Sequence, residues 1–449
     1  MNDYSFKSKP YEHQKTAFYL SRDKEAFALF MEMGTGKSKV LIDTAAYLWM
    51  TGKINMFIVV APKTVAINWM TEEFAKHMPD HVRTNIVEYR SLIGHKALKN
   101  KKIIDELFVT DAALKLNVLV INIEALQSTD GPGQKFLERV LRTHSALFAI
   151  DESTTIKSPQ ARRTKTILKL GKLANFRRIA TGSPTTNSPL DLYTQMTFLD
   201  AEIFSSSFVS YRNRYAIVKE QQRTGGVRYP VIDGYQNLEE LRAIVAPHAF
   251  IITKKECLDL PEKLFVTRYF EMTTRQKRIY TDLRVESIAE LDKSAVLTMN
   301  DVGFAGISSV EEFIELANSA VVEDPKDTVA VMMALQKMIK LHQIACGWVK
   351  NDLGEVVELD MDEGVSPRIG ALLSVLEDLP SEDKVIIWCN YTYDILRITK
   401  ALRAVYGEKA VEPFYGETTK DERKDIIKNL NDQAHDLRFF VGQPLTGGR

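Results

Sequence analysis

Short apolar runs alternate with amphipathic stretches through the first half of the chain. The apolar runs predict buried strands at Ala26–Phe30, Asn55–Val60, Ile86–Tyr89, Val118–Ile123, Ala146–Ile150 and Arg177–Thr181. Helical spacing predicts helices at Tyr11–Leu20, Val40–Trp49, Val65–Met78 and Phe136–Arg142. Strands that alternate with helices predict an α/β domain built around a mostly parallel sheet.

The pattern changes after Leu199. We expect no strands between Ala201 and Pro247, where Tyr211–Tyr215 and Lys219–Arg228 are basic and aromatic. These two segments could contact a nucleic-acid backbone, although an ordinary solvated surface is slightly favoured. Later strands are predicted at Leu264–Phe270, Lys384–Cys389 (buried) and Leu437–Val441, with helices at Thr274–Met299, Val310–His342, Arg368–Leu379 and Tyr393–Tyr406. Ser-Pro pairs predict helix starts at Ser158, Ser188 and Ser366.

A glycine-rich turn follows the first predicted strand and reads Met31-Glu32-Met33-Gly34-Thr35-Gly36-Lys37-Ser38. Strand, glycine turn and helix together are typical of a phosphate cradle, in which the backbone from Met33 to Gly36 approaches phosphate oxygens. Lys37 would contact the β- and γ-phosphates, and Ser38 would bind Mg²⁺. Met31 stands where the general pattern has glycine, and an ordinary helix-entry turn is the alternative.

A second candidate lies where the strand Ala146–Ile150 ends in two acids. Ligands of parallel sheets bind beyond the carboxyl ends of the strands. Asp151 would therefore hold Mg²⁺, and Glu152 would accept a proton from the attacking water. Solvated acids at a strand end are the alternative, which the upstream lysine loop makes less favoured. Thr181 and Ser183 could relay between nucleotide and a neighbouring lobe, or belong to a plain turn.

Composition limits the class of protein. The chain has 449 residues, enough for two or three domains, with 45% apolar and 26% charged residues, as in globular proteins. Lysine plus arginine equals aspartate plus glutamate at 59 each, so net charge neither supports nor excludes a nucleic-acid partner. Three widely separated cysteines fit neither a disulfide framework nor a zinc site. We expect a cytoplasmic location in a bacterial or infected cell, with a nucleus as the alternative, and no membrane association.

The ordered set of motifs resembles the superfamily-two helicase-like ATPases of the Snf type, the DNA translocases related to chromatin remodellers. The motifs that carry the resemblance are Tyr11–Gln14, Met31–Ser38, Val60–Lys63, Asn68-Trp69, Asn122–Glu124, Asp151–Ile156, Thr181–Asn187, Asp259–Lys263, His342-Gln343, Tyr415–Thr418, Arg423 and Val441–Arg449. The resemblance implies two RecA-like lobes, residues 1–200 and 259–449. A helical and basic linker at 201–258 and an insertion at about 274–345 would complete the chain.

The resemblance also implies residue roles. Gln14 is similar to the glutamine that reads adenine, Lys37 and Ser38 to the phosphate and Mg²⁺ ligands, and Asp151-Glu152 to the DEAD/DEAH acids. Ser153 and Thr154 depart from that motif. Thr181–Pro184 resembles the motif that links ATP to DNA contacts, and Tyr415 and Arg423 resemble elements that grip a DNA strand. The implied cofactors are ATP and Mg²⁺, and the implied partner is double-stranded DNA.

Thr446–Arg449 resembles the start of a further motif, so we expect an incomplete second lobe. The leading hypothesis is an ATP-driven motor on double-stranded DNA. One alternative is a nucleotide-dependent DNA-binding module with little turnover. A weaker alternative is an RNA strand separator.

Overall fold

The computed structural model describes residues 4–90, 100, 104–108, 115–128, 130–222, 228–259, 261–293, 336–351, 354–361, 364 and 366–444. Contacts divide the chain into a first unit, residues 1–222 and 228–262, and a second unit, residues 223–227 and 263–449. Several predicted features lie outside the described residues, namely residues 223–227 of the basic segment, Leu260, the segments 294–299 and 310–335, and the motif Thr446–Arg449.

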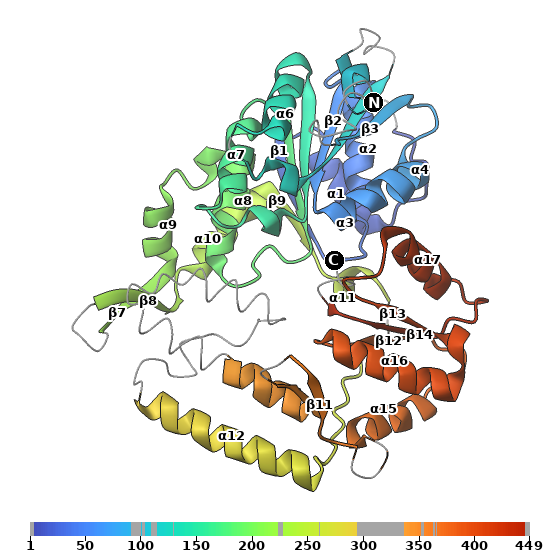
Figure 1. Cartoon of the computed structure of the whole chain (residues 1–449). Helices are drawn as coiled ribbons and strands as arrows, with labels where there is room; N and C mark the ends of the chain where they lie inside the picture. Colours follow the sequence, from blue (N-terminus) through green and yellow to red (C-terminus); the bar gives the residue numbers. More distant parts are fainter. Residues whose placement is uncertain are drawn as a thin grey trace. The chain divides into compact units, whose positions relative to one another are not determined.

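A seven-stranded parallel sheet organises the first unit (Figure 1). Its order is β3-β4-β2-β5-β6-β1-β9. The strands are β1 (Ala26–Met31), β2 (Met56–Ala61), β3 (Thr84–Glu88), β4 (Leu116–Asn122), β5 (Ala146–Asp151), β6 (Phe176–Thr181) and β9 (Ala249–Ile252). Six of these strands match the apolar runs of the sequence, which confirms the predicted α/β fold with a mostly parallel sheet.

Helices cover both faces of this sheet. One face packs on α1 (Glu12–Ser21), α2 (Lys37–Met50), α3 (Lys63–Asn68), the π-helix η1 (Trp69–Glu73) and α4 (Phe74–His77). The other face packs on α6 (Pro132–Thr143), α7 (Arg162–Gly171) and α8 (Leu192–Leu199). Along β1, Ala28 and Phe30 join one hydrophobic core, and Phe27, Leu29 and Met31 join the other. Burial on both faces explains why these strands are continuous apolar runs.

Short 3-10 helices connect the larger elements, at η2 (Glu106–Phe108), η4 (Ile123–Leu126), η5 (Ser153–Ile156), η6 (Pro189–Asp191), η7 (Ala201–Ile203), η8 (Ala246–His248) and η9 (Glu408–Ala410). The Ser188 hydroxyl accepts a hydrogen bond from the Leu190 N–H at the start of η6, and Ser366 caps α15 (Pro367–Glu377) through Ile369. These two predicted helix starts are confirmed. The one at Ser158 is wrong, because α7 begins at Arg162 after an intervening turn.

The expectation of no strands between Ala201 and Pro247 is also wrong. After α9 (Phe208–Tyr215), the strands β7 (Ala216–Gln222) and β8 (Arg228–Tyr235) form a two-stranded antiparallel sheet. These strands carry polar side chains, including those of the Lys219–Asp233 ion pair at 2.6 Å, so the sequence has no apolar run from which they could be predicted. The chain then passes through α10 (Leu238–Val245), pairs β9 with β1, and forms α11 (Lys254–Cys257).

The second unit contains a three-stranded parallel sheet in the order β12-β14-β13. Its elements are α12 (Thr274–Lys293), β10 (Trp348–Lys350), β11 (Val356–Glu358), α15, β12 (Val385–Trp388), α16 (Thr392–Tyr406), β13 (Val411–Phe414), α17 (Lys420–Asn431) and β14 (Phe439–Gly442). Its core includes Ile395, Leu402, Phe439 and Val441.

Two strand predictions in this unit need correction. Leu264–Phe270 forms no strand in the described structure, and Leu264 and Phe265 are 87% and 91% exposed. Strand-favouring residues need a neighbouring surface to pack on, and Leu264 and Phe265 contact little such surface. β12 was expected to be buried, but Ile386 and Trp388 on one face are exposed, and Val385 and Ile387 on the other face are only partly buried.

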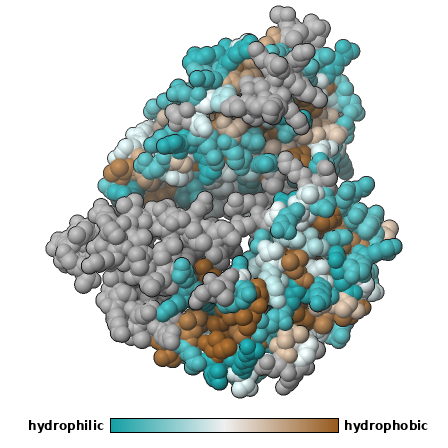
Figure 2. Space-filling model, viewed as in Figure 1, coloured by the Kyte–Doolittle hydropathy of each residue, from teal (hydrophilic) through white to brown (hydrophobic). Residues whose placement is uncertain are grey.

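The visible surface in the upper part of Figure 2, which belongs to the first unit, is mainly hydrophilic with small hydrophobic areas. In the described part of the chain, none of the helices has both the length and the hydrophobicity that a membrane-spanning segment needs.

Candidate functional site

The glycine-rich turn connects the end of β1 to the start of α2. Thr35 folds back on this turn, since its N–H and hydroxyl both donate to the Glu32 carbonyl, at 3.2 and 2.7 Å. Gly34 and Gly36 have φ angles of +80° and +90°, which side chains rarely adopt. Gly36 is also the N-cap of α2. The turn therefore has the backbone of an anion cradle at a helix N-terminus.

Gln14 on α1 packs directly on this turn. A Cβ atom on Gly36 would lie 2.2 Å from Gln14 Nε2. The Gln14 amide N–H donates to the Thr35 carbonyl at 3.0 Å, and its oxygen accepts from the Tyr11 N–H at 3.1 Å. His13 Nε2 lies 2.8 Å from the same Thr35 carbonyl. The structure thus brings Gln14 to the phosphate turn, and its contact with adenine stays a prediction.

Replacing Gly36 with alanine is expected to destabilise the first unit more than the same change at Gly34. Both substitutions impose a left-handed alanine, at a cost of about 1–2 kcal/mol. At Gly36 the new methyl group must also displace Gln14, whereas the nearest atom at Gly34, Lys254 Cε, is 3.5 Å away. Urea unfolding without nucleotide measures the difference. Equal losses for the two variants would contradict the close packing of Gln14 on Gly36.

Lys37 lies beside the acids at the end of β5. Its ammonium donates to the carbonyl oxygens of Met31 and Glu32, at 3.0 and 3.5 Å. Burial raises the pKa of Asp151, which is 5% exposed, while the Trp69 hydrogen bond and the Lys37 charge act in the opposite direction. The Trp69 indole N–H donates to Asp151 Oδ2 at 2.9 Å. The structure therefore brings Lys37 and Asp151 together from distant parts of the sequence.

Glu152 stands next to Asp151 in a left-handed conformation, with φ of 54°. Burial, and then the negative charge of Asp151, raise the pKa of Glu152, whereas Lys37 and a Thr181 hydrogen bond lower it. The Thr181 hydroxyl donates to Glu152 Oε2 at 3.3 Å, and the Ser183 N–H donates to the Thr181 hydroxyl at 3.4 Å. A polar chain therefore runs from the predicted base into the turn after β6.

Several neighbours of this site were not assigned roles from the sequence. Trp69 was noted only as a motif residue, but it fixes Asp151. Ser153, one of the two departures from the DEAD/DEAH pattern, is buried and bonds Gln195, whose amide binds the carbonyls of Pro184 and Asp191. The Lys254 N–H donates to the Glu32 carboxylate at 2.7 Å. Non-local contacts of this kind have no local sequence signal.

The oxygens available here suit magnesium. Ser38 and Asp151 supply a hydroxyl and a carboxylate, and Mg²⁺ usually takes one or two protein carboxylates and completes its shell with water and phosphate oxygens. No group of three or more His, Cys, Asp or Glu side chains suited to a metal occurs in the described part of the chain. The residues present therefore fit a cation that arrives with a nucleotide, rather than an all-protein metal cage.

A family model described as "SNF2-related domain" matches residues 11–340, well over half of the chain. The chain belongs to the SNF2-related family. The family resemblance expected from the motifs is thereby confirmed.

This SNF2-related chain is similar to several curated proteins. It is 22% identical over 446 residues to the Caenorhabditis elegans "SWI/SNF-related matrix-associated actin-dependent regulator of chromatin subfamily A containing DEAD/H box 1 homolog", covering 93% of this chain and 42% of the relative. It is 22% identical over 471 residues to the "ATP-dependent helicase FUN30" of Saccharomyces cerevisiae, covering 96% and 39%. The chain thus spans about two-fifths of the length of these relatives. Among solved structures, the Sulfolobus solfataricus SWI2/SNF2 ATPase core in complex with dsDNA has 21% identity and a TM-score of 0.44, covering 99% of this chain and 80% of that one.

The two remaining predicted residues of the SNF2-related chain, Tyr415 and Arg423, lie together in the second unit. Arg423 donates to the carbonyls of Thr418 and Tyr415, at 2.9 and 3.0 Å, and its guanidinium lies 5.1 Å from the Phe414 ring centre. The Tyr415 N–H donates to the Thr418 hydroxyl at 3.0 Å. In this structure Arg423 braces the turn that carries Tyr415, and their contact with DNA stays a prediction.

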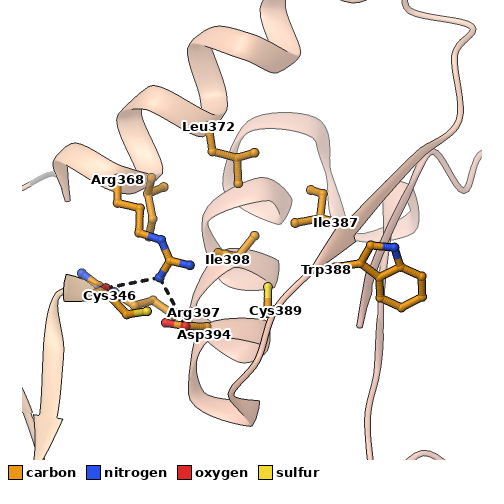
Figure 3. Close-up of a pocket in the computed structure, with 10 residues that line it drawn as sticks. Cys346, Arg368, Leu372, Ile387, Trp388, Cys389, Asp394, Arg397 and Ile398 are labelled. Atoms are coloured by element: carbon orange, nitrogen blue, oxygen red, sulfur yellow. Dashed lines mark hydrogen bonds and ion pairs between the residues drawn. The ribbon is translucent and has the colours of Figure 1, made fainter. Parts of the chain in front are cut away.

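A cavity of about 190 Å³ lies elsewhere in the second unit (Figure 3). It is lined by Cys346, Arg368, Ile369, Leu372, Ile387, Trp388, Cys389, Asp394, Arg397 and Ile398. Arg368 donates to Asp394 at 3.2 Å, and Asp394 also accepts from the Trp348 indole at 2.9 Å. Burial raises the pKa of both cysteine thiols to about 12, so they stay protonated at neutral pH. No predicted site residue lines this cavity.

Proposed function

We propose that this chain is an ATP-driven motor that couples hydrolysis of Mg·ATP to movement along double-stranded DNA. The observation that carries the proposal is the meeting of Lys37, Asp151 and Glu152 beside a left-handed glycine turn. The Saccharomyces cerevisiae relative, whose printed name is "ATP-dependent helicase FUN30", supports it.

Each predicted site residue of the first unit has a physical role in this proposal. The amides around Gly34 and Gly36 would bind phosphate oxygens, and Lys37 would exchange its carbonyl partners for the β- and γ-phosphates. Gln14 would hydrogen-bond the adenine. Ser38 and Asp151 would hold Mg²⁺, which neutralises phosphate charge when it is bound.

Glu152 would accept a proton from the attacking water. A carboxylate of raised pKa is a stronger base than one in water, and burial beside Asp151 provides that shift. The hydrogen bonds from Glu152 through Thr181 to Ser183 would couple the protonation state of Glu152 to the conformation of the loop after β6. We also propose that the turn carrying Tyr415 contacts the DNA backbone.

Phosphate release by the 449-residue chain, with and without nucleic acid, tests the proposal. Duplex DNA should stimulate release severalfold, and more than single-stranded DNA or RNA of equal length. Saturable nucleotide binding without release would favour the nucleotide-dependent DNA-binding module. Stimulation by RNA alone would favour the strand separator, and either result would overturn the motor on double-stranded DNA.

A further inference from the structure

A second lysine lies at the glycine turn and comes from a part of the chain more than 200 residues further on. Lys254 is the first residue of α11, which follows β9. A Cβ atom on Gly34 would lie 3.5 Å from Lys254 Cε and 3.7 Å from Lys254 Nζ, which is ordinary van der Waals contact. The charged end of this side chain therefore faces the turn to which the proposed function assigns the phosphates.

Two hydrogen bonds of Glu32 hold the backbone of Lys254 in this place. The Glu32 N–H donates to the Ile252 carbonyl at 3.0 Å, and the Glu32 carboxylate accepts from the Lys254 N–H at 2.7 Å. Met31 pairs with Ile252, so the pairing of β1 with β9 continues into the start of the turn. Because the turn itself fixes the backbone of Lys254, the lysine side chain begins at a defined point beside Gly34.

The ammonium of Lys254 has no counter-charge among the residues that the structure describes, where no hydrogen bond or ion pair reaches it. Two acids of this region bind other groups. The carboxylate of Glu32 accepts from the Lys254 backbone, and that of Glu256 accepts from the N–H and the hydroxyl of Thr253, at 2.7 and 2.8 Å. Lys254 is also partly buried. A partly buried ammonium gains stability from a bound anion, because the anion supplies the missing counter-charge.

The position along the turn indicates which phosphate this lysine would bind. The Lys37 ammonium bonds the carbonyls of Met31 and Glu32, and Lys254 faces Gly34, so both charges lie at the strand end of the turn. In phosphate loops the backbone amides bind the inner phosphates, and the lysine reaches the outer ones. We propose that Lys254 is a second phosphate-binding lysine, which contacts the γ-phosphate and makes the site prefer ATP to ADP.

This inference rests on the proposed function, and the test separates the two. Lys254→Met removes the charge and keeps most of the length of the side chain. A fluorescent, non-hydrolysable ATP analogue and the matching ADP analogue are each titrated into the full chain with Mg²⁺ present. The Kd of the ATP analogue should rise about 10–100-fold, the usual effect of losing a hydrogen bond to a charged group. The Kd of the ADP analogue should stay nearly unchanged, because ADP has no γ-phosphate.

Lys255→Met is the matched control, because Lys255 lies on the same short helix, has the same charge and is exposed. It should leave both affinities unchanged. Lys254→Arg keeps a positive charge and should recover part of the affinity for the ATP analogue, whereas a side chain that only packs on Gly34 would be replaced equally well by methionine. Urea unfolding without nucleotide checks that Lys254→Met is folded, and Lys254→Gln takes its place if it is not.

An unchanged affinity for the ATP analogue in the neutral Lys254 variant, while the parent chain binds this analogue, overturns the inference and leaves the proposed function intact. An equal loss for the ATP and ADP analogues, or an equal loss in Lys255→Met, overturns the contact with the γ-phosphate. If the parent chain binds neither analogue, the proposed function fails and the role of Lys254 fails with it.

Discussion

Replacing Glu152 with glutamine is expected to lower the rate of ATP hydrolysis about 10²–10⁴-fold, the usual contribution of a general base. The amide keeps the size and the hydrogen bond from Thr181 but cannot take a proton from water. Nucleotide affinity should stay close to that of the unchanged chain, because Lys37, Ser38 and Asp151 are untouched. Single-turnover phosphate release and equilibrium binding of a fluorescent ATP analogue measure the two quantities separately.

Glu88→Gln is the control for this change. Glu88 also ends a strand of the same sheet, but β3 is at the sheet edge and Glu88 pairs with Arg90 at 3.1 Å. The same loss of charge there should leave the rate of hydrolysis unchanged. Normal turnover by the Glu152 variant would show that another group activates the water.

Replacing Arg178 with alanine is expected to reduce the free energy of unfolding of the first unit by about 3–5 kcal/mol, because buried carbonyls lose a charged donor. Arg178 is fully buried on β6. Its guanidinium donates to the carbonyls of Ser21, Lys24, Glu25 and Arg177, at 2.6 to 3.2 Å. Burial lowers its pKa to about 9, so it remains charged at neutral pH.

These bonds join β6 to the end of α1 and the start of β1, the elements that carry Thr181, Gln14 and the glycine turn. Hydrogen exchange of β1 and β6 peptides across a urea series measures the stability of the first unit apart from the second. Arg177→Ala is the control, since it removes the same charge from a half-buried neighbour and should cost within about 1 kcal/mol. A loss at Arg178 no larger than that at Arg177 would contradict the anchoring role.

Much of the first sheet could be predicted because its strands are covered on both faces. β2, β4 and β5 are therefore unbroken apolar runs, which are visible in the sequence. β9 could not be predicted, because it has only four residues and its strand is defined by pairing with β1, which lies more than 200 residues upstream. The opposite error at Leu264–Phe270 arose because composition favours a strand, whereas the described part of the chain pairs no strand with this segment.

The phosphate turn and the acid pair were visible because each is local, a few consecutive residues with a fixed chemistry. The residues that hold them in place are not local. Arg178 lies in a strand that reads as Phe-Arg-Arg-Ile-Ala-Thr, where either arginine could face water. Trp69 acts on β5 from a helix more than 70 residues away, and its role depends on a π-turn that periodicity does not show.

The backbone at Glu152 has a consequence for how this protein can adapt to heat. A non-glycine residue with φ of 54° costs about 1–3 kcal/mol, which glycine would largely avoid. Selection for thermal resistance alone would therefore favour glycine there, although glycine has no carboxylate. The most durable version of this loop would lack the proposed base, and the catalytic role proposed for Glu152 would explain why the strained glutamate is present there.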